Sequence, residues 1–140
     1  MPLEMSRGRE TILLVEGDEP DIRDFVGEVL KTRGYTVLEA RDGEDALQVV
    51  DRYREPLHLV LTDVMMPKLG GRELVTRLLA RHPHLGVLYM SGYPDDALGA
   101  RGVLEAGAIL LAKPFTLQQL VAKVRQVLDA TRLDRRLRVP

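Results

Sequence analysis

The chain has 140 residues, of which 45% are hydrophobic and 29% charged, and its formal net charge is −1. This composition is typical of one globular domain, and the balanced charge gives no reason to expect binding to nucleic acid or to a membrane surface. The absence of cysteine excludes disulfides, thiolate metal sites and cysteine nucleophiles. The apolar runs are too short to span a membrane, and the polar N-terminus lacks the apolar segment of a secretion signal. We therefore expect a single soluble, cytoplasmic domain.

Short apolar runs alternate along the chain with segments of helical spacing. The runs cover residues 12–15, 35–38, 57–61, 87–90 and 108–112. Runs of this length that are apolar on both faces suit strands of a parallel sheet that is covered on both sides. Apolar residues at the spacing of one helical face predict helices that contain residues 22–30, 46–53, 74–79 and 117–128.

A fourth helix is expected over residues 95–106, but it is interrupted by Gly99 and Gly102. Because each glycine costs about 1 kcal/mol relative to alanine in a helix, we expect this helix to be poor and mobile. The last helix should begin at Thr116-Leu-Gln-Gln119, a capping box in which each end residue's side chain binds the other's backbone N–H.

Five strands that alternate with five helices predict right-handed βαβ units and one parallel sheet in an α/β fold. We expect a flexible segment over residues 1–9, the folded domain over 10–130 and a basic tail over 131–140. In such a sheet the functional crevice lies beyond the carboxyl ends of the strands. The polar residues at these ends are Glu16, Asp18 and Glu19 after the first strand, Asp63 after the third, Ser91 after the fourth and Lys113 after the fifth.

Four segments carry a family resemblance, namely residues 15–20, 61–74, 89–93 and 111–115. The second, which begins Leu61-Thr-Asp63-Val-Met-Met-Pro67, resembles the phosphoacceptor loop of response-regulator receiver domains from two-component systems, and the others resemble the family's remaining signatures. The wording is closest to receivers attached to hybrid histidine kinases. The resemblance implies a doubly wound, flavodoxin-like sheet with the strand order 2-1-3-4-5.

The resemblance also implies a phosphorylation site. Asp63 would be the nucleophile, attacking a phosphohistidine or a small phosphodonor to form an acyl phosphate. Lys113 would supply a positive charge and Ser91 a hydroxyl to the phosphoryl group. Mg²⁺, which prefers carboxylate and phosphate oxygens, would bind Asp63, the backbone carbonyl of Met65 and an acidic pair after the first strand. The bond between Lys113 and Pro114 would be cis.

The acidic turn departs from the family pattern, because Gly17 stands where the family has two adjacent acids. Either Glu16 and Asp18 form the metal-binding pair around a bulge, which we favour, or one acid is lost and Glu19 takes its place. Several carboxylates clustered without a cation repel one another, which supports a bound metal as the purpose of the cluster.

A second departure concerns the output of the switch. Many receivers have an aromatic residue three positions before the lysine, and here that position is Leu110. With leucine there, we expect the signal to be relayed by backbone and loop shifts. By analogy with the family, the donor is a histidine kinase or a histidine phosphotransfer protein, and the output protein binds the face formed by the fourth helix, fifth strand and fifth helix.

Other readings remain open. Each feature alone has an ordinary explanation, such as an acidic turn that merely caps a helix. A pseudo-receiver would keep the fold as an interaction module without taking phosphate. A phosphohydrolase of the haloacid-dehalogenase class needs a second aspartate two residues after the nucleophile, where this chain has Met65. We therefore expect no turnover enzyme, only slow self-dephosphorylation at a rate that depends on Met65 and Tyr93. For His82 and His84 we expect no metal role.

Overall fold

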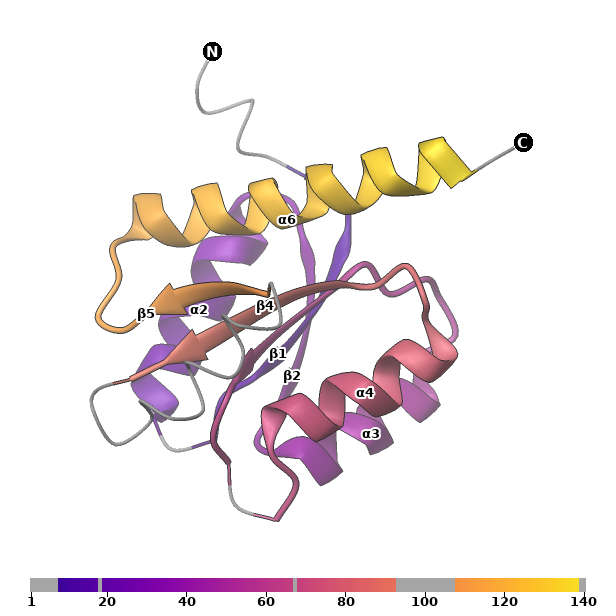
Figure 1. Ribbon diagram of the computed structural model, residues 1–140. Coiled ribbons are helices and arrows are strands. Elements are labelled where there is room, and N and C mark those ends of the chain that lie inside the picture. The colour runs from indigo at the N-terminus through magenta and orange to yellow at the C-terminus, as the bar shows by residue number, and fades with distance from the viewer. Residues whose placement is uncertain (1–7, 18, 67, 93–107, 139–140) are drawn as a thin grey trace.

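The computed structural model describes residues 8–17, 19–66, 68–92 and 108–138, with side chains to residue 132. Strands and helices alternate from residue 11 to residue 91 (Figure 1), and the helix expected over 95–106 lies outside the described residues. The elements are β1 (Thr11–Val15), α2 (Pro20–Thr32), β2 (Thr36–Ala40), α3 (Gly43–Arg52), β3 (Leu59–Asp63), α4 (Gly71–Arg81), β4 (Gly86–Ser91), β5 (Ile109–Ala112) and α6 (Leu117–Arg138).

The strands form one parallel sheet in the order β2-β1-β3-β4-β5, which confirms the expected fold class and strand order. The register aligns the carboxyl ends of the central strands. Asp63 at the end of β3 pairs with Met90, and Ser91 at the end of β4 pairs with Ala112. Because Lys113 directly follows Ala112, the sheet brings Asp63, Ser91 and Lys113 to the same edge.

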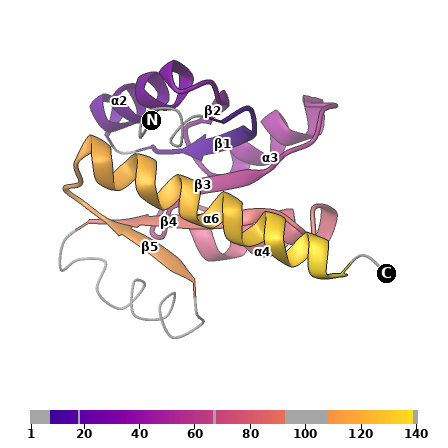
Figure 2. The same ribbon diagram turned by 90° about the horizontal axis from the view of Figure 1, so that it is seen from above.

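Helices cover both faces of the sheet, with α2 and α6 on one side and α3 and α4 on the other (Figures 1 and 2). This layering follows from the strands, whose successive side chains point to opposite faces. In β1, Ile12 and Leu14 pack with the residues of α2 and α6, whereas Leu13 and Val15 pack with those of α3 and α4. All four are fully buried, so a continuous apolar run is what this central strand requires.

Side-chain caps define where two helices begin. The capping box expected before α6 is confirmed: the backbone N–H of Thr116 donates to Oε1 of Gln119 (2.8 Å), and the N–H of Gln119 donates to Oγ1 of Thr116 (3.0 Å). The carboxylate of Asp42 accepts from the N–H of Asp45 (2.8 Å), so α3 starts earlier than its apolar spacing indicates. At its other end α6 continues to Arg138, through residues that the sequence assigns to a basic tail.

A polar cluster ties the segment before β1 to α6. Arg125 donates through Nη2 to Oε2 of Glu10 (2.7 Å) and through Nη1 to the hydroxyl of Tyr35 (3.1 Å). Burial raises the pKa of Glu10, but the hydrogen bond and charge of Arg125 and the backbone N–H groups of Arg9 and Glu10 together lower it below its ordinary value of 4.5. Burial raises the pKa of the Tyr35 phenol. Within the described part of the chain, no helix is both long enough and apolar enough to cross a membrane.

Candidate functional site

Three carboxylates surround one ammonium group at the carboxyl edge of the sheet. Nζ of Lys113 lies 2.7 Å from Oε1 of Glu16, 2.9 Å from Oδ1 of Asp63 and 3.2 Å from Oε1 of Glu19. Glu16 follows β1, Glu19 immediately precedes α2, Asp63 ends β3 and Lys113 follows β5. The topology therefore brings three sequence-distant segments together: the turn between β1 and α2, the end of β3 and the end of β5.

The cluster is largely removed from water. Glu16 has no exposed surface, and the side chains of Asp63 and Lys113 are only 9% and 10% exposed. Burying a carboxylate is costly unless an opposite charge and hydrogen bonds compensate for the lost hydration, which the Lys113 ammonium does here. The side chain of Glu19 is 52% exposed, so its contact with Lys113 is the most hydrated of the three.

One oxygen of the cluster stays unsatisfied. Oε2 of Glu16 is buried and has no hydrogen-bond partner among the described residues. A buried carboxylate oxygen beside Asp63 is suitable for Mg²⁺, which takes oxygen ligands from one or two carboxylates. Within the described ranges, however, no three carboxylate or histidine side chains are arranged around a common metal position. The described carboxylates face Lys113, and Asp18, the other acid expected to bind metal, lies outside the described residues.

Two glycines allow the backbone to approach closely at the site. A β-carbon on Gly71, the first residue of α4, would lie 2.0 Å from the carbonyl oxygen of Asp63. A β-carbon on Gly17 would lie 2.2 Å from the backbone oxygen of Arg41. Real β-carbons do not approach backbone atoms so closely. Glycine is therefore required at both positions, and the residue inserted into the acidic turn has a steric reason to be Gly17.

The other expected site residues occupy different positions around the cluster. Ser91 is buried at the end of β4, and its backbone oxygen accepts a hydrogen bond from the N–H of Lys113 (2.7 Å). Met65 is 53% exposed, two residues beyond Asp63. The bond between Lys113 and Pro114 is cis, as the resemblance implies. Tyr93 lies outside the described residues.

Leu110, at the position where many receivers have an aromatic residue, is half-buried on β5. It packs against the buried cluster between the sheet and helices α3 and α4. Sequence reasoning expected Glu19 at the metal only as an alternative and did not foresee its contact with Lys113. This contact could have been indicated by the position of Glu19 in the acidic turn, two residues after the inserted Gly17.

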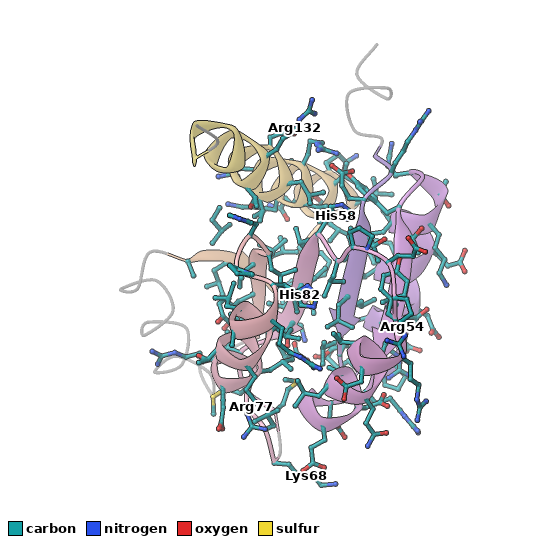
Figure 3. All side chains as sticks on the ribbon, turned by 90° about the vertical axis from the view of Figure 1, so that its right-hand side faces the viewer. Arg54, His58, Lys68, Arg77, His82 and Arg132 are labelled. Atoms are coloured by element: carbon teal, nitrogen blue, oxygen red, sulfur yellow. The ribbon has the colours of Figure 1, made fainter. Side chains whose placement is uncertain are left out.

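The three histidines lie at the opposite end of the sheet, where the strands begin. They line a cavity of about 560 Å³ between the segment before β3, the loop after α4 and α6. Figure 3 shows the molecule from this end, with His58, His82 and Arg132 labelled. Nδ1 of His58 accepts a hydrogen bond from the backbone N–H of Thr11 (3.0 Å), which joins the starts of β3 and β1.

Comparisons with known proteins agree with this fold. Residues 12–125 match the family model described as the response regulator receiver domain. The chain is 37% identical over 122 residues to the sensor kinase CckA of Brucella abortus, and it is 34% identical over 119 residues to the receiver protein CpdR of the same species. These matches cover 87% and 85% of this chain, but 13% of CckA and 97% of CpdR.

Solved structures give the same result. A response regulator receiver domain protein from Clostridium thermocellum superimposes with a TM-score of 0.77 at 27% identity, over 89% of this chain and 98% of that one. The receiver domain of NtrX from Brucella abortus gives 0.73 at 31% identity, over 84% and 98%. The chain therefore belongs to the response-regulator receiver domain family, a class of signalling modules of two-component systems.

Proposed function

We propose that this receiver domain is a phosphoacceptor switch in which Asp63 takes a phosphoryl group from a histidine kinase or a histidine phosphotransfer protein. The observation that carries this proposal is the 2.9 Å contact between Nζ of Lys113 and Oδ1 of Asp63, at the edge where a flavodoxin-like sheet forms its functional crevice. The contact supports the proposal because a buried carboxylate lies beside a cation that can neutralise an arriving phosphoryl group.

The chemistry follows from these residue types. A carboxylate oxygen of Asp63 attacks phosphorus, a new P–O bond forms, and the P–N bond to the donor imidazole breaks, with the electron pair leaving on the ring nitrogen. Phosphoryl transfer depends mainly on positioning and on neutralising charge on the equatorial oxygens. Lys113 supplies one positive charge, and Ser91, at the end of the neighbouring strand, supplies a hydroxyl donor.

Mg²⁺ is the proposed cofactor of this step. Its ligands would be Glu16, whose Oε2 is buried without a partner among the described residues, Asp18, Asp63 and the backbone carbonyl of Met65. When bound, the ion neutralises charge on the phosphoryl oxygens and holds them in place. Lys113 contacts both Glu16 and Asp63 and compensates their charges.

The output is a change in protein–protein contacts. The phosphoryl group can shift a conformational equilibrium only through contacts that differ between the two states, and Lys113 and Ser91 can provide them. Lys113 joins β5 to the start of α6, so we propose the face formed by the fourth helix of the family fold, β5 and α6 as the surface that the output protein binds. The similarity to the receiver of a sensor kinase supports a kinase as the donor.

A pseudo-receiver is the second candidate, favoured by two observations. Gly17 interrupts the acidic turn, and Lys113 already contacts three carboxylates. Such a domain would keep its fold and bind partners without accepting a phosphoryl group.

Intact-protein mass spectrometry after incubation with acetyl phosphate and Mg²⁺ distinguishes the two candidates. We expect the mass of one phosphoryl group to be added to the parent protein, none to Asp63→Asn and none to the parent in excess EDTA. Asp24→Asn, at an exposed carboxylate on α2, is the matched control and should be phosphorylated like the parent. A folded parent that gains no mass at saturating Mg²⁺ would establish the pseudo-receiver.

A further inference from the structure

The carboxylate of Glu19 does not cap the helix that this residue precedes. Glu19 is the N-cap residue of α2, and its backbone oxygen accepts from the N–H groups of Ile22 (3.0 Å) and Arg23 (3.1 Å). N-cap side chains usually accept a hydrogen bond from their own helix, as Asp42 does at α3. The side chain of Glu19 makes no such bond and instead contacts Nζ of Lys113 at 3.2 Å.

The turn that presents Glu19 is constrained on both sides. Gly17 lies so close to the backbone oxygen of Arg41 that no side chain fits there. Pro20 occupies the first position of α2, where its ring fixes the backbone dihedral angle φ. The turn therefore directs Glu16 from the interior and Glu19 from the surface towards the same ammonium group.

The number of N–H donors on Lys113 limits how many acceptors it can bind at once. A lysine ammonium has three N–H donors and no acceptor. Three carboxylates, those of Glu16, Asp63 and Glu19, lie within 3.2 Å of Nζ of Lys113, so each donor has a partner. Phosphorylation removes the charge of the Asp63 carboxylate, so a phosphoryl oxygen can take over the donor that faced Oδ1. It can obtain a second donor only if Glu16 or Glu19 gives one up.

The burial of the two remaining carboxylates, Glu16 and Glu19, decides which one leaves. Glu16 has no exposed surface, so water cannot solvate its carboxylate if the contact with Lys113 breaks. Asp63 carries the phosphoryl group and stays at the site. Glu19 is 52% exposed, so water can solvate its carboxylate when the contact breaks. Its release therefore costs the least free energy.

We propose that Glu19 is a positioning residue that occupies one donor of Lys113 in the resting domain and is displaced by the phosphoryl group. It acts as an electrostatic brake, by which we mean that it weakens the binding of the phosphoryl group, because part of the interaction between Lys113 and that group is used to replace Glu19. The inference rests on the proposed function, because it assigns a regulatory role at the same site.

Equilibrium binding of beryllofluoride, a stable analogue of the phosphoryl group, tests this proposal. Its dissociation constant is measured by calorimetry in Mg²⁺ for the parent, for Glu19→Gln and for Asp24→Asn. Glutamine keeps the size of the side chain and removes its charge. Because exposed ion pairs contribute little, we expect Glu19→Gln to bind the analogue about two- to fivefold more tightly than the parent. Asp24→Asn removes the same charge from the exposed face of the same helix and should leave the affinity close to that of the parent.

Salt dependence separates a lost ion pair from a rearranged turn. The gain for Glu19→Gln should shrink between low salt and about 1 M NaCl, where exposed charges are screened, whereas a rearranged turn would keep its effect. Equal or weaker binding by Glu19→Gln, with a parent that does bind, would overturn the brake and leave the proposed function standing. No binding by any folded variant, parent included, would overturn both.

Discussion

Gly71 and Asp63 are in direct backbone contact. A β-carbon on Gly71 would lie 2.0 Å from the carbonyl oxygen of Asp63, and the N–H of Gly71 donates to the carbonyl oxygen of Val64 (2.9 Å). Helix α4 therefore begins against the end of β3, and the intervening loop closes back on the strand that carries the proposed phosphoacceptor. The position of Asp63 depends on this contact, although Gly71 has no side chain of its own.

Gly71→Ala should accordingly disturb the site from a position eight residues away in sequence. The added methyl group overlaps backbone, which cannot rotate aside, so we expect a loss of about 1–3 kcal/mol in the free energy of unfolding. Labelling of Asp63 by acetyl phosphate should also slow. Urea unfolding and mass spectrometry measure the two effects. Gly70→Ala is the matched control, because its β-carbon would lie an ordinary 3.7 Å from the oxygen of Val64; equal losses for both variants would contradict the steric argument.

Removal of the Lys113 ammonium should destabilise the domain through Glu16. In Lys113→Met the fully buried carboxylate loses its cation, and breaking a buried ion pair from one side costs about 3–5 kcal/mol. The double variant Glu16→Gln, Lys113→Met should recover part of that loss, because an amide is less costly to bury than an unpaired charge. Thermal or urea unfolding in EDTA measures the difference. A double variant no more stable than Lys113→Met would show that Glu16 is not the cause.

The pairing of Glu10 with Arg125 predicts how stability depends on pH. Burial raises the pKa of Glu10, but Arg125 together with backbone N–H groups favours the charged carboxylate, and the pKa in the folded chain lies below its ordinary value of 4.5. Its contribution is therefore complete above about pH 4.5 and is lost as the pH falls through the lowered value. Glu10→Gln should reduce the free energy of unfolding by about 1 kcal/mol at pH 7, a difference that disappears in acid. Glu55→Gln, at an exposed carboxylate, is the control and should cause no such loss.

Gly17→Ala tests the inserted residue of the acidic turn. A methyl group here overlaps the backbone oxygen of Arg41, so the turn must shift and carry Glu16 and Glu19 away from Lys113. We expect weaker Mg²⁺ binding, by about tenfold if the shift costs roughly 1.4 kcal/mol, measured by calorimetry. Gly27→Ala, whose β-carbon would lie 3.4 Å from the flexible end of Glu39, is the control. Unchanged affinity in Gly17→Ala would show that the turn does not hold the metal.

Most of the fold could be predicted from the sequence because its signals are local. Central strands buried on both faces require continuous apolar runs, and β1 and β3 have them. The edge strand β2 was harder to place. The sequence predicted residues 35–38, whereas the strand spans Thr36–Ala40, because its half-exposed residues do not form a strong apolar run. The start of α3 depends on the side chain of Asp42, which apolar spacing does not reveal.

The site could be predicted only as far as the backbone determines it. Parallel topology places Asp63, Ser91 and Lys113 at one edge whatever their side-chain conformations. The contact between Glu19 and Lys113 depends on the path of one turn and on two flexible side chains, for which the sequence has no periodic signal. The bond between Arg125 and Glu10 joins residues 115 positions apart and is equally invisible to local patterns.

The length of α6 has a mechanical consequence. The helix begins four residues after Lys113 and runs across the sheet to Arg138, at the end where the strands start (Figure 1). Its 22 residues measure about 33 Å, so a tilt of roughly 5° at the first turn displaces the far end by about 3 Å. A small rotation of α6 at the end near Lys113 would therefore appear as a larger displacement at the opposite end of the domain.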